Sequence, residues 1–139
     1  MIREAISYLQ QGFSVFPVEQ ASKRPAIKSW GEFQKRRPTE EELQEFFGHK
    51  NVGIAIVCGK ISGGLVVLDF DGRDFDKIVS RFKEAFPEIA HRTRWVKTGS
   101  GRSHCWLRCP DIPEELTRLE WRSLNEEATV ELRANQHYV

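Results

Sequence analysis

The stretch Leu65-Val66-Val67-Leu68-Asp69-Phe70-Asp71-Gly72 decides the fold, because it places a strongly apolar strand directly before two carboxylates. Four consecutive aliphatic residues that follow a glycine-rich turn are typical of a buried strand. Side chains alternate between the two faces of a strand, so Asp69 and Asp71 leave one face about 7 Å apart and Phe70 leaves the other. The stretch therefore predicts a buried central strand that carries two acids on one face near its end.

The two acids are a candidate metal site. Oxygen ligands on a rigid strand suit Mg²⁺ or Mn²⁺, which take one or two carboxylates together with substrate phosphates. A simpler interpretation is that Asp71 and Gly72 only begin a turn and that Asp69 is solvated. An unpaired acid directly after four apolar strand residues is costly to bury, which favours the metal interpretation.

The rest of the chain predicts an α+β domain in which helices cover one face of a sheet. Thr39 and Glu42 form a capping box that starts a helix ending at Gly48. Apolar periodicity predicts further helices over residues 2–11, 75–86 (ended by Pro87) and 114–120. The expected strands are residues 13–18, 51–57, 65–70, 94–97, 105–108 and 129–132, with a hairpin between the fourth and fifth.

Length and composition predict one folded domain. The chain has 139 residues, of which 40% are hydrophobic and 29% charged, as in ordinary globular proteins. No apolar run approaches the roughly 18 residues that span a bilayer, and the start of the chain does not read as a signal peptide. We therefore expect a cytoplasmic protein without a membrane partner. The three cysteines are an odd number, which argues against a disulfide framework.

Positive charge is concentrated in two segments although the net charge is only +1. Residues 22–37 carry six cations and one acid, and residues 92–108 carry five cations and no acid. Local clusters of this kind bind phosphates, but a solvated charged surface explains either cluster equally well. The candidate contacts to nucleic acid are Lys23, Arg24, Lys28 and, on a later strand, Arg133.

A glycine-rich loop is the second candidate site, with the sequence Thr98-Gly99-Ser100-Gly101-Arg102-Ser103-His104. Its glycines allow close approach of the backbone to an anion, its amides and hydroxyls can donate to phosphate oxygens, and Arg102 adds charge. The loop is not a P-loop, and an ordinary hairpin turn is an equally good interpretation. His104 begins the next strand, where an imidazole can bind phosphate or relay a proton, or be purely structural.

A third acid lies in Thr129-Val130-Glu131-Leu132-Arg133. Glu131 stands among apolar strand residues and can complete a site of three carboxylates. The alternative is a simple pair with Arg133, which lies two residues on and therefore on the same face.

The acidic pair, the glycine-rich loop that ends in His104 and the later strand acid together resemble the archaeo-eukaryotic primase superfamily. The resemblance is closest to the bifunctional DNA primase/polymerase domain of prokaryotic, plasmid and phage replication proteins. It extends to segments outside the site, namely Ala5–Leu9, Phe16-Pro17, Lys23-Arg24-Pro25 and Asn51–Ala55. The resemblance implies an RRM-like primase-polymerase catalytic core, with a mainly antiparallel or mixed sheet and flanking helices.

The same resemblance implies template-directed nucleotidyl transfer. Asp69, Asp71 and Glu131 would hold two ions of Mg²⁺ or Mn²⁺, residues 98–104 would bind the nucleotide, and His104 would contact its phosphates. In two-metal transfer one ion activates the 3′-hydroxyl of the primer and the other neutralises the triphosphate. The implied partners are a DNA template and primer, nucleoside triphosphates, and a helicase domain or protein.

Two features depart from the family pattern. Arg102 stands where relatives usually have a small residue, so phosphate binding there would rely on its guanidinium. The chain stops at Val139, where relatives usually continue, so residues 1–139 are expected to be a catalytic domain truncated at its C-terminus.

Two other functions remain open. A haloacid-dehalogenase-like phosphatase shares the D-x-D-G pattern of residues 69–72. That family, however, has Thr or Ser at the position of Arg73, and a later pair of acids at the end of a parallel sheet. A non-catalytic nucleic-acid-binding or replication-initiation module would stack bases on tryptophans that lie beside cations; these are Trp30, Trp95, Trp106 and Trp121. A zinc site at His104, Cys105 and Cys109 has the wrong spacing.

Overall fold

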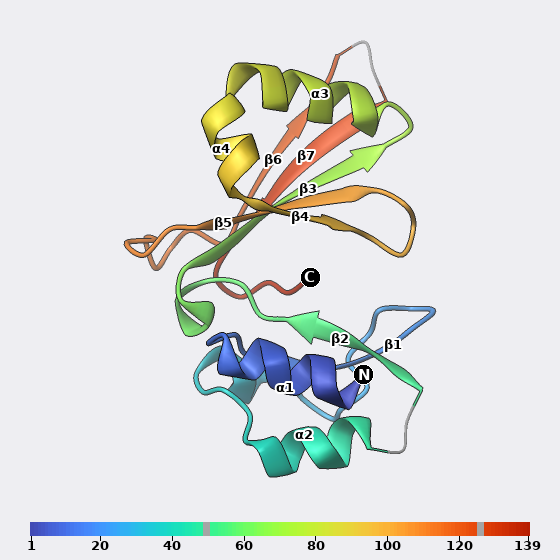
Figure 1. Cartoon of the computed structure of the whole chain (residues 1–139), viewed down its shortest axis with the longest axis vertical. Helices are drawn as coiled ribbons and strands as arrows, with labels where there is room; N and C mark the ends of the chain where they lie inside the picture. Colours follow the sequence, from blue (N-terminus) through green and yellow to red (C-terminus); the bar gives the residue numbers. More distant parts are fainter. Residues whose placement is uncertain (49–50, 125–126) are drawn as a thin grey trace.

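The computed structural model describes residues 1–48, 51–124 and 127–139. They form two units, one above the other in Figure 1. The N-terminal unit consists of α1 (Ile2–Gln10), β1 (Val15–Glu19), η1 (Gly31–Gln34), α2 (Glu40–Phe47) and β2 (Val52–Ile56). After the short helix η2 (Lys60–Ser62), the second unit consists of β3 (Leu65–Gly72), α3 (Phe75–Ala85), α4 (Pro87–Arg92), β4 (Arg94–Lys97), β5 (Ser103–Arg108), β6 (Arg118–Arg122) and β7 (Ala128–Arg133).

Every strand pair within the two sheets is antiparallel. In the N-terminal unit β1 pairs with β2, and in the second unit five strands follow the order β4-β5-β3-β7-β6. The strand β3 is central, as its sequence predicts. Its register places Asp69 opposite His104 of β5 and opposite Glu131 of β7. Directly opposed residues share a face, so these three side chains form a row across the sheet.

The two faces of the five-stranded sheet have different partners. Leu68, Phe70 and Cys105 pack beneath α3, and the rings of Phe70 and Phe82 lie 5.6 Å apart. We call the other side, toward the N-terminal unit, the cleft face. Side chains along β3 and β5 point alternately to the two faces of the sheet. The cleft face therefore carries Val67 and Trp106 at its apolar end, and the charged row lies beyond them.

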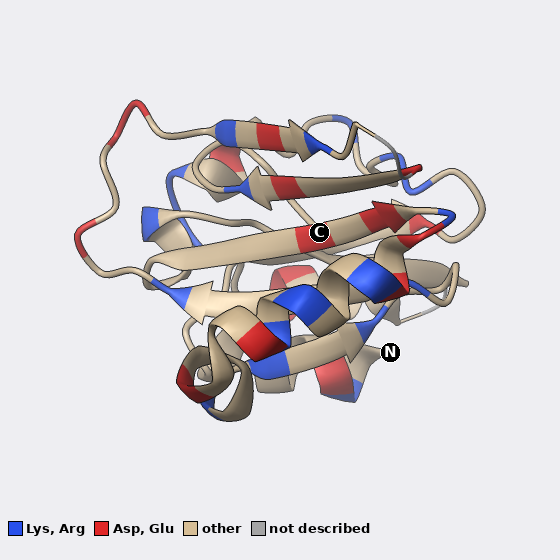
Figure 2. Cartoon of the chain, turned by 90° about the horizontal axis from the view of Figure 1, so that it is seen from above, with Lys and Arg blue, Asp and Glu red and all other residues tan. Residues whose placement is uncertain are grey.

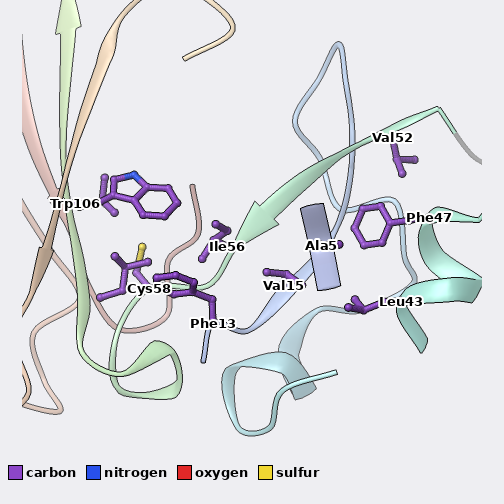
Figure 3. Close-up of a cluster of buried hydrophobic side chains, with 11 residues drawn as sticks. Ala5, Phe13, Val15, Leu43, Phe47, Val52, Ile56, Cys58 and Trp106 are labelled. Carbon is purple, nitrogen blue, oxygen red and sulfur yellow. The ribbon is translucent and has the colours of Figure 1, made fainter. Parts of the chain in front are cut away.

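A shared hydrophobic cluster holds the two units together. Figure 3 shows Phe13, Ile56 and Trp106 converging between the sheet and the N-terminal unit. The rings of Phe13 and Trp106 are 5.8 Å apart and meet edge to face, which is a favourable aromatic geometry. The cluster therefore fixes the position of the N-terminal unit over the cleft face.

The last residues of the chain run between the two units (Figure 1). Ile56 and Val139 exchange backbone hydrogen bonds of 2.8 and 3.0 Å, which extend the small sheet beside β2. The ring of Tyr138 packs edge-on against Phe16 and Trp30. This segment therefore forms part of the boundary between the units.

Most of the predicted elements are confirmed, and one prediction is wrong. The α2 capping box is present, with the Glu42 amide 3.2 Å from the Thr39 hydroxyl, and the β4–β5 hairpin is as expected. The short helix expected over residues 114–120 is absent, because residues 118–122 form β6. Its charged and apolar residues alternate with the period of a strand. The helix α3 ends just before Pro87, as expected, and Pro87 also occupies the first turn of α4, a position that suits proline.

Gly72 ends β3 in a conformation that excludes other residues. Its φ is +94°, and a Cβ there would lie 2.1 Å from the carbonyl oxygen of Glu127. The glycine thus lets the chain turn sharply after Asp71 while β7 stays close. Among the described residues, no helix is both long enough and apolar enough to cross a bilayer.

Candidate active site

A cleft of about 890 Å³ lies between the N-terminal unit and the charged part of the cleft face. It brings together most of the residues that the sequence singled out. Its sheet side includes Asp69, Asp71, His104, Glu131 and Arg133. Its opposite side includes Lys23 and Arg24, together with the C-terminal residues Gln136, His137, Tyr138 and Val139. Lys28 does not line this cleft.

Asp69 is the centre of the floor of the cleft. One carboxylate oxygen lies 3.3 Å from His104 Nε2 and the other lies 3.1 Å from Arg133 Nη2. Burial, the largest single influence, raises the pKa of Asp69, but His104, Arg133 and Lys23 together lower it below its usual value of 3.8. Asp69 is therefore an anion that positive neighbours hold in place at neutral pH.

Glu131 lies beside Asp69, and both carboxylates contact the guanidinium of Arg133. Its Oε1 atom is 3.0 Å from Arg133 Nε and 3.1 Å from Arg118 Nε, and its Oε2 atom accepts a 3.1 Å hydrogen bond from Arg118 Nη2. The pair with Arg133 that the sequence offered as an alternative is thus present. Glu131 nevertheless lines the cleft, so the ion pair and a ligand role are compatible.

Charges of both signs continue along the outer strands of the floor. Arg118 and Arg122 both pair with Glu120 on β6, and Glu120 lies opposite Glu131 in the sheet. Figure 2 shows acidic and basic positions interspersed on the neighbouring strands. The guanidinium groups separate carboxylates that would otherwise repel one another across the sheet.

Asp71 lies at the open end of the floor, where its side chain is 51% exposed. Its Oδ1 atom is 2.7 Å from Arg102 Nε. Arg102 is the residue that departs from the family pattern, and the structure gives it a carboxylate partner. Asp71 is thus more exposed than Asp69, whose side chain is 15% exposed, and lies nearer to the solvent from which a ligand would enter.

The glycine-rich loop closes the β4–β5 hairpin. The Gly101 amide donates to the Thr98 carbonyl at 2.9 Å, and the Thr98 amide donates to the Arg102 carbonyl at 2.8 Å, so the loop forms the turn of a hairpin, as expected. Thr98, Gly99 and His104 line the cleft, whereas Ser100, Gly101, Arg102 and Ser103 do not. Any phosphate contact by the loop in this arrangement therefore falls to its two ends.

Lys23 approaches the floor from the opposite unit in an unusual backbone conformation. Its φ is +57°, and Gln136, which also lines the cleft, has φ +62°. The Lys23 amide donates to the Glu19 carbonyl at 2.8 Å, and its carbonyl accepts from the Tyr138 hydroxyl at 3.3 Å. Left-handed conformations outside glycine are uncommon and cluster at functional sites. The loop is therefore held in the wall of the cleft, where the charge of Lys23 helps to lower the pKa of Asp69.

The chemistry of the carboxylates fits a hard divalent cation. Asp69 and Asp71 leave the same face of β3, and Glu131 lies directly opposite Asp69. Oxygen donors of this kind suit Mg²⁺ or Mn²⁺. In residues 1–48, 51–124 and 127–139, no three His, Cys, Asp or Glu side chains already form a metal-binding group. Ion binding would require the carboxylates to turn away from their arginines.

Arg118 and His137 are among the cleft residues that sequence reasoning missed. Arg118 was assigned to a helix, although the alternation of Arg118, Glu120 and Arg122 with apolar residues is a strand signal. His137 had no signal, and burial, followed by the nearby charge of Arg133, lowers its pKa below 6.5.

Three of the four tryptophans are packing residues. Trp30 stacks on Phe16, Trp95 packs on Phe70, and Trp106 belongs to the shared cluster. Trp121 is 52% exposed. Trp30 and Trp106 nevertheless also line the cleft, so base stacking on these two rings stays a prediction. His104 and Cys105 leave opposite faces of β5, in agreement with the rejection of a zinc site.

The fold and the site together define an α+β domain with an open, charged cleft between an antiparallel sheet and a smaller N-terminal unit. The sequence matches the family model described as bifunctional DNA primase/polymerase, N-terminal, over residues 5–139. The chain therefore belongs to this family. Membership implies, in general terms, DNA primase or polymerase activity of the nucleotidyltransferase type, with DNA and nucleotides as substrates. A search of curated proteins found no match.

Proposed function

We propose that this domain performs template-directed nucleotidyl transfer at the cleft, as a DNA primase, a DNA polymerase or both, by a two-metal mechanism. The observation that carries the proposal is the register of β3, which sets Asp69 between His104 and Glu131 on the floor of an open cleft. Two strand partners of different chemistry, one acidic and one an imidazole, thereby meet at one partly buried carboxylate.

Asp69, Asp71 and Glu131 are the proposed ligands of Mg²⁺ or Mn²⁺. When bound, such ions lower the pKa of a primer 3′-hydroxyl and neutralise a triphosphate. Asp69 supplies a ligand from the middle of the floor, where His104 and Arg133 now hold its two oxygens, and it would exchange Arg133 for the ion. Asp71 and Glu131 supply further oxygens from the open end of β3 and from β7.

Positive residues around the floor are the proposed phosphate contacts. His104 donates to phosphate oxygens through Nε2, the atom that faces Asp69. Lys23 and Arg24 approach from the opposite side of the cleft, which would enclose a triphosphate between two walls. The backbone amide of Gly99 is an additional donor at the end of the hairpin.

The proposed setting is replication or repair of a prokaryotic, plasmid or phage genome in the cytoplasm, with a helicase domain or protein as a further partner. The phosphatase alternative loses support, because the sheet around β3 is antiparallel where that fold expects a parallel one. A non-catalytic module gains one supporting observation, since each of the three carboxylates is paired with an arginine.

Isothermal titration of Mn²⁺ and a nucleoside triphosphate tests the proposed site without relying on turnover. Wild-type protein should bind the Mn²⁺–nucleotide complex, whereas Asp69→Asn and Glu131→Gln should weaken binding at least roughly tenfold, a loss of about 1.4 kcal/mol. Asp111→Asn removes an exposed acid outside the cleft and is the matched control. Equal binding by all four proteins would exclude these carboxylates as ligands and favour the non-catalytic module.

A further inference from the structure

A second groove, of about 630 Å³, runs between α1 and the edge strand β4. On the α1 side it is lined by Arg3, Glu4, Ser7, Tyr8 and Gln11, and on the β4 side by Arg94, Trp95, Val96 and Lys97. Glu4, Tyr8 and Val96 also line the cleft, so the two hollows adjoin. We call this second hollow the α1–β4 groove.

The α1–β4 groove is positively charged and its cations are available. Its lining includes three cations, Arg3, Arg94 and Lys97, and one acid, Glu4, whose carboxylate lies 2.6 Å from the amino group of Met1. Within the described parts of the chain, none of these three cations forms an ion pair with a carboxylate; Arg94 lies 5.7 Å from the Trp106 ring.

The cations of the cleft floor behave differently. Arg102, Arg118 and Arg133 all have carboxylate partners. A paired arginine must give up its partner to bind a phosphate, whereas an unpaired one releases only solvent counterions. The α1–β4 groove is therefore the better-prepared surface for a polyanion.

The groove leads directly to the proposed catalytic residues. Val96, which the two hollows share, lies opposite His104 in the β4–β5 ladder, and neighbouring strands are about 4.8 Å apart. Tyr8, the other side of this junction, offers an aromatic ring beside Phe13 and Trp106. A chain of nucleotides in the groove would thus arrive with its end beside His104.

We propose that the α1–β4 groove binds single-stranded nucleic acid and guides it into the cleft. This inference rests on the proposed function, because it supplies the strand that nucleotidyl transfer at the cleft would use. A single strand fits better than a duplex, since its bases are free to stack on the Tyr8 ring at the junction while its phosphates contact the cations.

Fluorescence anisotropy with a labelled single-stranded oligonucleotide of roughly 15 nucleotides tests the groove without catalysis. The triple variant Arg3→Gln, Arg94→Gln, Lys97→Gln should bind about tenfold more weakly, and the slope of log K against log salt should fall by about 2, because each lost phosphate contact accounts for roughly 0.7. The control triple Lys35→Gln, Arg37→Gln, Arg92→Gln removes the same charge from exposed positions outside the groove and the cleft. It should keep both the affinity and the slope.

Equal losses of affinity in the two triple variants would overturn the proposed role of the groove, because they would show an effect of net charge alone. Unchanged binding by the groove variant, tighter binding of a duplex, or no binding by the wild type would overturn it as well. The nucleotide titration described above separates the two proposals. Nucleotide binding without a groove effect leaves the proposed function standing, and a groove effect without nucleotide binding supports the groove while the proposed function fails.

Discussion

Replacing Arg133 by methionine should destabilise the domain and make its stability depend on a divalent cation. The guanidinium lies 3.1 Å from Asp69 and 3.0 Å from Glu131, two acids that face each other across β3 and β7. Coulomb's law gives about 5 kcal/mol for each contact at an effective dielectric constant of about 20. Desolvation cancels much of this, and breaking a buried pair costs about 3 to 5 kcal/mol. Because the Arg133 side chain is 30% exposed, we expect a loss of about 2 to 3 kcal/mol.

Urea unfolding, followed by tryptophan fluorescence in EDTA and in MnCl₂, measures both parts of this prediction. In EDTA the midpoint of Arg133→Met should fall by roughly 1 M urea. Mn²⁺ at about ten times its Kd should restore about 1.4 kcal/mol, because the ion replaces the lost charge between the two acids. Arg122→Met, whose arginine is 75% exposed and pairs with Glu120, is the control and should change stability by less than about 1 kcal/mol.

A loss in EDTA that Mn²⁺ leaves unchanged would refute the assignment of Asp69 and Glu131 as metal ligands. No loss in EDTA would refute the electrostatic account of the floor itself.

Three further predictions concern single residues. The pKa of Asp69 lies below 3.8 in the folded protein, so its contribution to stability is present above pH 3.8 and disappears as the pH falls through the folded pKa. The unfolding free energies of wild type and Asp69→Asn should therefore converge on acidification. A difference between them that stays constant with pH would contradict this. Thr39→Ala should cost about 1 kcal/mol in urea unfolding because it removes the α2 cap, and an unchanged midpoint would argue against the capping box. Native protein should react with iodoacetamide at the exposed Cys109 alone, since Cys58 and Cys105 are buried and burial raises the pKa of Cys58 to about 12; mass spectrometry that finds three labels would contradict the packing.

The elements that sequence predicted correctly have local signals. Four aliphatic residues before Asp69 indicate a buried strand, and the capping box of Thr39 and Glu42 starts α2 by contacts three residues apart. The strand β6 was missed, because its charged residues also suit the surface of a helix. Only its pairing with β7 separates the two interpretations.

The residues of the candidate site were largely predictable from the sequence, but the contacts between their side chains were not. Asp69, Asp71, His104 and Glu131 stand out in the sequence as polar residues on apolar strands, and all four line the cleft. The contacts of Asp69 with His104 and Arg133 depend on strand registers between segments 35 and 64 residues apart. Nothing local sets those registers. The arrival of Lys23 from the other unit likewise follows from the shared hydrophobic cluster.

Primer extension by wild-type protein and by Asp71→Ala, with Mn²⁺ and nucleoside triphosphates, tests the central claim most directly. Asp71 is exposed at the end of β3, so its truncation should leave the fold intact, which thermal unfolding can verify. The account predicts extension by the wild type and a loss of at least about a hundredfold in the variant, because a ligand of the ions that stabilise the transition state is gone. Undiminished extension by a folded Asp71→Ala protein would contradict it.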